Sequence, residues 1–447
     1  MKKYQSYKSS GIEWIGEIPE HWGISKVKYT TEIFGRIGYR GYTIEDIVNE
    51  DEGVITISPS NIKNDKFTIE GTNTYLSFEK YHQSPEIMIF TNDIILVKTG
   101  STIGKTSIIP EYVPKMTINP QLVVLKNIKM NNRYFYYQTV CDYFKLSFLV
   151  EQTGSSTPTI SQEKINEFPI LKPTSTEQIQ IVRFLDEKTE LIDKLISTKE
   201  RKIDLLKQQR ISLINEIVTK GLDPKVKMKN SGVEWIGEIP EHWEMKRVSN
   251  FGIFFKGNGI KKDEVKDEGL PCIRYGEIYT KYDRVVYQPL SFIDEETSKN
   301  SVSIKKGDIL FTGSGETIED IGKSILYYGE NDIFVGGDII VLRLNGDLNP
   351  LFISYLMNTS FVQYQKSLSG RGEIIVHIYS KNIKEIKTPL PPPNEQLQII
   401  EYLDTRIKEI DDLVSMEERK IILLKEYRQS LISEVITGKI DVRTNLN

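Results

Sequence analysis

The chain has 447 residues, 39% of them hydrophobic, which is enough for two or three domains that each bury a core. No apolar run is long enough to span a bilayer, and the first residues, MKKYQSYKSSGIEW, have no hydrophobic stretch behind their lysines, so we expect a cytoplasmic protein without a membrane partner. A net charge of -4 does not favour nucleic-acid binding by bulk electrostatics, so any DNA surface must be local. Two distant cysteines and four scattered histidines indicate neither a disulfide framework nor a metal site.

The chain contains a long internal repeat. Residues 8–27, KSSGIEWIGEIPEHWGISKV, recur at 229–248 as KNSGVEWIGEIPEHWEMKRV. The segment EQIQIVRFLDEKTELID from Glu177 recurs as EQLQIIEYLDTRIKEID from Glu395. Residues 30–170 and 250–390, which lie between the repeated segments, match only in outline. The sequence therefore alternates constant and variable regions.

A glycine-rich loop, Gly100 to Thr106 (GSTIGKT), raises the hypothesis of an NTPase. A P-loop needs four residues between its glycines and a helix after its lysine. Here three residues intervene, and the β-branched run from Thr106 is stopped by Pro110, which predicts a strand. A corresponding loop from Gly313 to Ser324 follows GDILFT in the second half. Both loops are predicted to join two strands.

Aromatic residues at helical spacing occupy Tyr134–Phe148 and Phe352–Tyr364. They indicate core packing rather than a base-stacking surface. With the strands above, they predict that the variable domains are α+β.

Apolar residues in alternating steps of three and four predict a heptad seam in each of the repeated segments at 177–217 and 395–435. The seam positions of the first are Val182, Leu185, Thr189, Ile192, Ile196, Lys199, Ile203, Leu206, Arg210, Leu213 and Ile217, and all recur 218 residues later. Each helix should bury the other, alone or with a helix from a partner. Whether the polar positions Lys199, Arg210, Glu417 and Arg428 fix the register, face a partner or face water stays open.

The direction of the two helices follows from chain length. A helix of some 40 residues is about 60 Å long, and the connection to the second domain can stretch only about 55 to 60 Å. An antiparallel pair is therefore favoured, with one variable domain at each end and an approximate two-fold axis. We predict globular domains at 1–172 and 223–390, a central coiled-coil helix at 173–222, and a C-terminal coiled-coil helix and tail at 391–447.

These features together closely resemble the specificity (S) subunit of type I restriction-modification systems. The resemblance is carried by GEIPEHW (Gly16–Trp22 and Gly237–Trp243), by GDIL, by PLPPPNEQ (Pro389–Gln396) and by the paired helical repeats, and it covers essentially the whole chain. It implies two target recognition domains, each reading half of a bipartite target in double-stranded DNA. It also implies helices that set the gap and dock two methyltransferase (M) subunits, with restriction (R) subunits when present. S-adenosylmethionine, ATP and magnesium would belong to those partners, and no cofactor to this chain.

The candidate DNA contacts are small donors and cations in the flexible loops, where a DNA backbone can approach closely. In the first domain they are Lys98, Thr99, Ser101, Thr102, Lys105, Thr106, Arg36, Tyr39, Arg40, Asn61 and Lys63. In the second domain they are Lys256, Asn258, Lys261, Arg274, Tyr275, Thr312, Ser314, Lys323, Ser324 and Arg371. Arg and Asn side chains can make bidentate contacts with guanine or adenine. The alternative for each is an ordinary surface residue.

No catalytic residue is predicted. His21 and His242 lie beside Trp22 and Trp243 in the repeated segment, which favours a packing motif that docks each domain on the helices. The sequence Pro391-Pro-Pro-Asn394 has the wrong order for an amino-methyltransferase motif. The rival hypotheses are an NTPase and a coiled-coil scaffold whose variable domains bind proteins.

Overall fold

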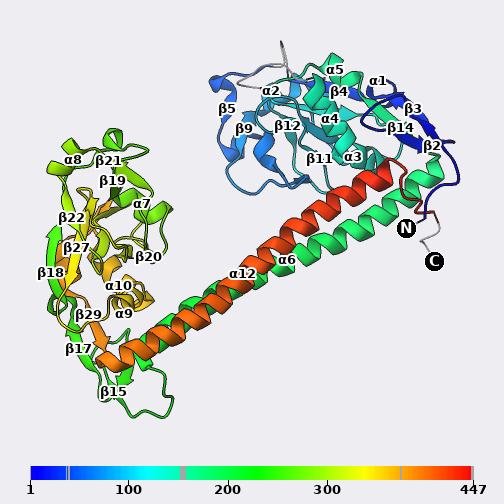
Figure 1. The fold of residues 1–447 in the computed structure, drawn as a ribbon. Helices are drawn as coiled ribbons and strands as arrows, with labels where there is room; N and C mark the ends of the chain where they lie inside the picture. The colour runs from blue at the N-terminus through cyan, green and yellow to red at the C-terminus, as the bar shows by residue number, and fades with distance from the viewer. Residues whose placement is uncertain (1, 37, 39–40, 152–157, 373–374, 444–447) are drawn as a thin grey trace. The chain divides into compact units, whose positions relative to one another are not determined.

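The computed structural model describes residues 2–36, 38, 41–151, 158–372 and 375–443 (Figure 1). The chain divides into two compact units. Unit 1 comprises Met1–Lys199 and Arg419–Asn447, and unit 2 comprises Glu200–Glu418. Each unit therefore takes residues from both halves of the sequence.

The variable domain of unit 1 contains two four-stranded sheets. The first has the order β11-β10-β13-β4, and the second has the order β12-β6-β9-β5. The strands of the first sheet are β4 (Glu32–Gly35), β10 (Ile94–Val97), β11 (Thr106–Ile108) and β13 (Leu122–Lys126). Those of the second are β5 (Ile47–Val48), β6 (Gly53–Ile57), β9 (Thr74–Ser77) and β12 (Met116–Ile118). The other short elements of the unit are β1 (Tyr7–Ser9), β2 (Glu17–Pro19), β3 (Gly23–Lys26), β7 (Ile62–Lys63), β8 (Lys66–Phe67), β14 (Pro169–Lys172), η2 (Ile44–Asp46), η3 (Glu50–Glu52), η4 (Pro59–Asn61), η5 (Pro85–Ile87), α1 (Val27–Thr30), α2 (Phe78–His82), α3 (Asn132–Val140), α4 (Asp142–Glu151) and α5 (Gln162–Asn166).

The variable domain of unit 2 has a similar topology, but its first sheet has a fifth strand and the fourth strand of its second sheet lies at the opposite edge. Its first sheet has the order β18-β27-β23-β25-β20, and its second has the order β21-β19-β26-β22. The strands are β18 (Gly252–Lys256), β19 (Leu270–Ile273), β20 (Val285–Val286), β21 (Ser291–Ile293), β22 (Val302–Ile304), β23 (Ile309–Thr312), β25 (Ser324–Tyr327), β26 (Ile333–Val335) and β27 (Ile339–Leu344). The other short elements are β15 (Met228–Asn230), β16 (Glu238–Pro240), β17 (Glu244–Arg247), β24 (Ser314–Gly315), β28 (Val376–His377), β29 (Lys387–Leu390), η6 (Val248–Asn250), η7 (Lys262–Glu264), α7 (Tyr275–Thr280), α8 (Glu295–Lys299), α9 (Pro350–Met357), α10 (Ser360–Ser369) and α11 (Ser380–Glu385). The predicted α+β class is confirmed.

Two long helices, α6 (Ser175–Lys220) and α12 (Pro393–Ile436), contribute a segment to each unit. In unit 2, Lys202 pairs with Glu417, and Arg210 pairs with Asp411. In unit 1, Asp193 pairs with Arg428, and Glu177 lies 4.0 Å from Arg443, just beyond the end of α12. Partner numbers fall along one segment as they rise along the other, so the helix segments are antiparallel within each unit. The predicted seam residues are buried or half-buried, whereas neighbouring positions such as Leu195 and Leu423 are exposed.

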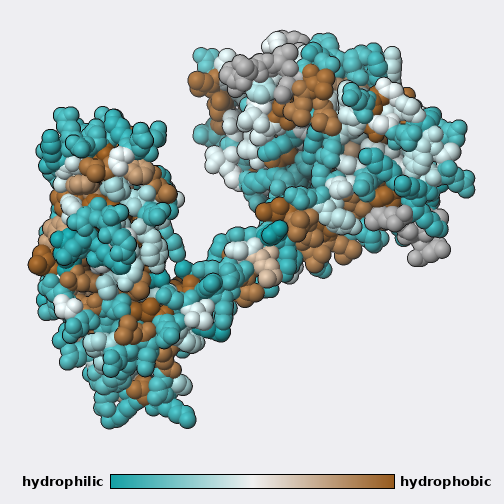
Figure 2. Space-filling model, in the orientation of Figure 1, coloured by the Kyte–Doolittle hydropathy of each residue, from teal (hydrophilic) through white to brown (hydrophobic). Residues whose placement is uncertain are grey.

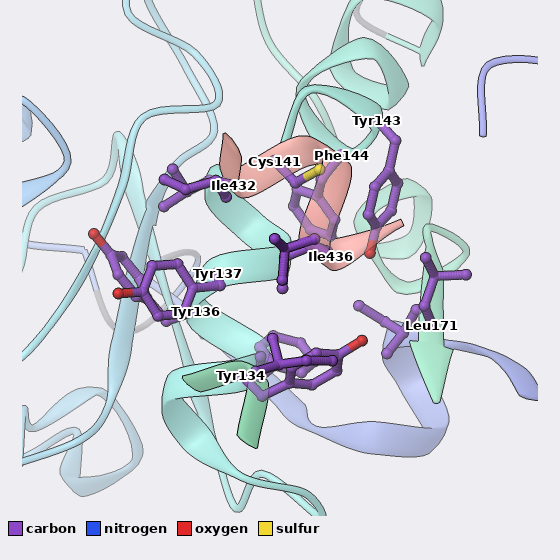
Figure 3. Packing of buried hydrophobic residues seen from close by; sticks show 14 of the residues in the cluster. Tyr134, Tyr136, Tyr137, Cys141, Tyr143, Phe144, Leu171, Ile432 and Ile436 are labelled. Carbon is purple, nitrogen blue, oxygen red and sulfur yellow. The ribbon is translucent and has the colours of Figure 1, made fainter. Parts of the chain in front are cut away.

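The core of unit 1 joins the variable domain to both helix segments. Tyr134, Phe135 and Phe144 of α3 and α4 are fully buried, and Ile432 and Ile436 of α12 lie among these aromatic rings (Figure 3). Burying this much aromatic surface is a large hydrophobic contribution. The prediction that these aromatic residues form core is confirmed, with Tyr364 of unit 2 as an exposed exception.

In each unit a glycine follows the C-terminal end of a long helix. Gly221 follows α6 in unit 2 and Gly438 follows α12 in unit 1, with φ of 75° and 72°. These left-handed conformations end the helices and suit glycine. A Cβ atom at Gly438 would lie 2.3 Å from Pro19, and one at Gly221 would lie 3.2 Å from Trp243. In both units a helix end therefore packs against an Ile-Pro-Glu-His-Trp segment.

Candidate DNA-recognition surfaces

The glycine-rich loop of unit 1 joins β10 to β11, so a strand follows it instead of the helix that a P-loop needs. Gly100 and Gly104 have φ of 107° and 84° and shape the turn. The Thr99 hydroxyl bonds that of Thr159 at 2.8 Å, and the Gly100 N–H bonds the carbonyl of Pro158. The predicted strand–loop–strand is confirmed.

The predicted contacts in this loop differ in exposure. Lys105 and Ser101 are exposed, while Lys98, Thr99 and Thr102 are half-buried. Partial burial lowers the pKa of Lys98. The Thr106 hydroxyl is buried and donates to the carbonyl of Ile95 at 3.1 Å. The loop therefore presents Lys105 as its exposed cation.

Two other candidates of unit 1 lie in the interior. Arg36 is only 2% exposed, and its guanidinium donates to the Ile118 carbonyl and the Thr117 hydroxyl, both at 2.6 Å. Asn61 is buried, and its side chain bonds the backbone of Ser58 and Thr68.

These bonds give Arg36 and Asn61 a structural role instead of the surface position that the sequence suggested. Lys63 is exposed. Tyr39 and Arg40 lie outside the described residues.

The corresponding loop of unit 2 is more enclosed than predicted. Thr312, Ser314 and Ser324 are buried. The Thr312 hydroxyl bonds that of Tyr279 at 2.7 Å, and Ser314 bonds His377 at 3.0 Å. Lys323 is half-buried and donates to the carbonyls of Tyr279 and Tyr282, which satisfies the end of α7. The hydroxyls of Thr312 and Ser314 and the amine of Lys323 therefore bond within the domain instead of facing outward, while the buried Ser324 hydroxyl has no partner among the described residues.

A basic cleft of about 400 Å³ in unit 2 brings three predicted residues together, namely Lys261, Arg274 and Tyr275. The cleft is also lined by Lys262, Lys281, Glu277 and the backbone of Gly336 and Gly337. Lys256, Asn258 and Arg371 are exposed elsewhere in the unit. Lys281 and Glu277 were missed from sequence, because their proximity depends on the α7 turn and on Ser291 of β21.

Glu277 is the buried carboxylate that holds the basic side chains of this cleft in place. It is 3% exposed, and its carboxylate accepts hydrogen bonds from Ser291, from Lys281 at 3.2 Å and from the Arg274 backbone N–H at 3.1 Å. Burial alone would raise the pKa of Glu277, but these hydrogen bonds outweigh it and lower the pKa. The carboxylate is therefore ionised at neutral pH and fixes the basic groups around it.

The variable domains are anchored to the helices by matched hydrogen bonds in both units. In unit 1, Glu177 accepts from Trp22 at 3.3 Å and lies 3.0 Å from the His21 ring nitrogen. In unit 2, Glu395 accepts from Trp243 at 2.8 Å and lies 2.5 Å from His242. The packing interpretation of the two histidines is confirmed.

Further along each helix the same pairing recurs. Gln178 accepts the backbone N–H of Asn131, and Gln396 that of Asn349, both at 3.0 Å. The Tyr137 hydroxyl donates to Asp186 at 2.6 Å, and that of Tyr355 donates to Asp404 at 2.5 Å.

The three matched pairs of helix residues, Glu177/Glu395, Gln178/Gln396 and Asp186/Asp404, form what we call the anchoring set. Every pair recurs at the 218-residue spacing, and that recurrence was the signal that could have found them. The two domains are therefore fastened to the helices in the same way.

Among the described residues, no group of three or more His, Cys, Asp or Glu side chains could hold a metal ion. In the same part of the chain, no helix is long and apolar enough to cross a membrane.

Comparison with known proteins decides the family. The sequence model of the type I restriction modification DNA specificity domain matches residues 32–207 and 240–425, which together are most of the chain. The chain belongs to this family. The two matches fall on the two variable domains with their following helices, so the family relation first suggested by the repeats is confirmed.

Relatives in this DNA specificity family match over long stretches. The type I restriction enzyme MjaVIII specificity subunit of Methanocaldococcus jannaschii is 25% identical over 406 residues, which cover 85% of this chain and 88% of that protein. The type I restriction enzyme EcoKI specificity subunit of Escherichia coli K12 is 28% identical over 209 residues, covering 46% and 44%.

Solved structures share the fold. A chain from work on complex assembly and conformational transition of the type I R-M system matches with a TM-score of 0.67 and 14% identity, covering 95% of this chain and 99% of that one. The HsdS subunit from Thermoanaerobacter tengcongensis matches with a TM-score of 0.50 and 15% identity, covering 95% and 98%.

Proposed function

We propose that this chain is the DNA-binding specificity subunit of a type I restriction-modification complex and that each unit reads one half of a bipartite target. The observation that carries this proposal is a difference between the residues that fasten each domain to the helices and the residues of its surface loops. The anchoring set is the same in both units, whereas the polar residues of the surface loops differ. A chain that holds two different readers on one repeated support suits an interrupted, asymmetric DNA sequence.

The exposed cations provide a route for backbone contact. Lys105 and Lys63 in unit 1, and Lys256 and the basic cleft in unit 2, are placed to neutralise phosphates. These contacts would position the duplex, and base contacts within the cleft would supply sequence specificity.

We further propose that the long helices dock two methyltransferase subunits, joined by restriction subunits when these are present. Apolar side chains are exposed on the helices at matched positions, Ile179 with Leu397, Leu195 with Leu413 and Leu205 with Leu423. Figure 2 shows apolar surface along the helices within a largely hydrophilic exterior. Repeated apolar positions fit two copies of one partner. The length of the helices would set the gap between half-sites.

Chemistry would belong to the partners. S-adenosylmethionine would be bound by the methyltransferase subunits, and ATP and magnesium by the restriction subunits, while this chain reads DNA in the cytoplasm without a catalytic role of its own. Support comes from the loop of Gly100 and Gly104, which resembles a P-loop in sequence but lacks its helix.

The test is co-expression of the full chain with its methyltransferase subunit in a host without DNA methylation, followed by mapping of modified adenines. We expect one interrupted motif that disappears when this chain is omitted. A stable complex that leaves no new methylation and binds no DNA sequence selectively would instead favour a protein-binding scaffold.

A further inference from the structure

The two variable domains share a structural frame at one particular turn. β6 in unit 1 and β19 in unit 2 each pair in parallel with one strand and antiparallel with another. Each is followed by a short helix, η4 or α7. In its first turn the N–H of the third helical residue donates to the backbone carbonyl of the capping residue, and the side chain of that third residue accepts the capping residue's N–H. The capping residue is Ser58 in unit 1 and Arg274 in unit 2. One frame therefore presents two different side chains.

The Arg274 side chain is held in place but is not fully satisfied. Its Nη2 lies 3.4 Å from the Glu277 carboxylate, and the same carboxylate accepts the Arg274 backbone N–H. Its Nε is buried, and no acceptor among the described residues bonds it. About a quarter of the side chain, 26%, is exposed. Arg274 is thus oriented by Glu277 and keeps donor capacity for a ligand.

The surroundings of Arg274 favour an anionic, hydrogen-bonding polymer. Four cations, Lys261, Lys262, Lys281 and Arg274 itself, line the cleft against the single carboxylate of Glu277. This local excess of positive charge contrasts with the net charge of -4 of the whole chain. Gly336 and Gly337 form part of the wall, where the absence of side chains lets another molecule approach the backbone.

We propose that Arg274 reads a guanine in the major groove for the second domain and that Glu277 is the positioning residue that orients its guanidinium. The planar guanidinium matches the O6 and N7 acceptors of guanine, and flanking lysines suit phosphates. This inference rests on the proposed function and deepens it.

Unit 1 lacks such a reader in the same frame. The Ser58 hydroxyl bonds Ser60 at 2.6 Å and lies 3.3 Å from Asn61. This short side chain is engaged within its own turn, so the two domains differ in chemistry at an equivalent position. The two half-sites should therefore differ at the base pair that faces this turn.

The test is competition binding by the assembled complex of the full chain with its methyltransferase subunit. The probes are DNA duplexes that carry the mapped target and each single base-pair substitution within it. The variants are Arg274→Ala, Arg274→Lys and Glu277→Gln, with Ser58→Ala as the matched control in unit 1. Thermal unfolding of each complex verifies that it is folded, and Arg274→Lys keeps the charge beside Glu277.

We expect the unmodified complex to discriminate against replacement of one G·C pair by about 10- to 100-fold. Both Arg274 variants should reduce this ratio to below about 3-fold at that pair alone, Glu277→Gln should reduce it partly, and Ser58→Ala should leave it unchanged. Because the ratio compares duplexes with one protein, it stays measurable when the absolute affinity falls.

Two results would overturn the inference. Discrimination at every G·C pair could persist in both Arg274 variants, or the variants could lose affinity equally for all duplexes with a weaker salt dependence, which identifies a phosphate contact. Failure of the proposed function has another signature, because the unmodified complex would then prefer no interrupted target.

Discussion

Replacing Lys366 with Met should stabilise unit 2 and remove a pH dependence from its unfolding. Lys366 lies in α10 and is 0% exposed. Its amine donates to the Met357 carbonyl at 2.8 Å and lies 3.5 Å from the side-chain oxygen of Gln363. Among the described residues no carboxylate offsets the burial of this amine. The aliphatic part of its side chain packs against Gly322, where an added Cβ would lie 3.1 Å from the Cδ of Lys366. In unit 1 the residue 218 positions earlier is Phe148, which packs under Gly104.

The size of the effect follows from the pKa. Burial lowers the pKa of Lys366 from 10.5 to about 7. Between these values the unfolded chain holds a proton that the folded unit lacks, so stability rises with pH and is lost again as pH falls toward 7. At about 1.4 kcal/mol per pH unit for one proton, unit 2 should gain about 2.5 kcal/mol between pH 7.5 and 9.5. Lys366→Met should lose this gain, and at pH 7.5 it should be more stable by about 3 kcal/mol after about 1 kcal/mol for the lost hydrogen bond.

The two cysteines provide the assay. Cys141 is buried in unit 1 and Cys272 is buried in unit 2, so a short pulse of thiol reagent along a urea series reports each unit separately. Labelling in full denaturant at each pH corrects for thiol reactivity. The midpoint for Cys272 should rise with pH in the natural sequence and not in Lys366→Met, while Cys141 serves as the internal control. An equal pH response of Cys272 in both proteins would refute a neutral buried amine.

Three further predictions concern DNA contact, anchoring and spacing. Lys105→Ala should lower the slope of log affinity for DNA against log salt concentration by about 1. Lys323→Ala should destabilise unit 2 and leave that slope unchanged. The slopes would be measured by fluorescence anisotropy in a KCl series, and equal slopes for the two variants would contradict this prediction. Asp404→Asn weakens the bond from Tyr355 and should lower the free energy of unfolding reported by Cys272 by about 1–3 kcal/mol without changing that reported by Cys141, and Asp186→Asn should give the reverse. A simultaneous loss at both cysteines would argue against separate anchoring. Seven residues inserted into each long helix add about 10 Å and should widen the methylated gap by about 3 base pairs; an unchanged gap would refute the spacer.

The repeat made the supporting framework predictable. The two helices, their seam and the docking role of Trp22 and Trp243 all follow from sequence patterns that occur twice. Because the heptad register repeats at eleven positions in both helices, few other secondary structures fit these segments. The antiparallel pairing within each unit was predicted from the reach of the connection between the first helix and the second domain.

The recognition surfaces were less predictable, because exposure there depends on contacts distant in sequence. Arg36 stands in a basic, glycine-rich stretch typical of a surface loop, yet it is buried by bonds to Thr117 and Ile118, some 80 residues away. Hydroxyls such as Thr106 and Thr312 satisfy partners within the domain, as Ser and Thr side chains often do. Arg274 could be proposed from sequence, but its orientation depends on Glu277 and hence on Ser291 of a neighbouring strand.

The most direct measurement of the central claim is the methylation pattern of a chain with a duplicated reader. Residues 31–167 would replace residues 251–385, so the first domain occupies both anchoring sets, and adenine methylation would be mapped after co-expression with the methyltransferase subunit. If each unit reads one half-site, the new target should contain the same half-sequence twice. Methylation of the original asymmetric target by this chain would contradict the claim.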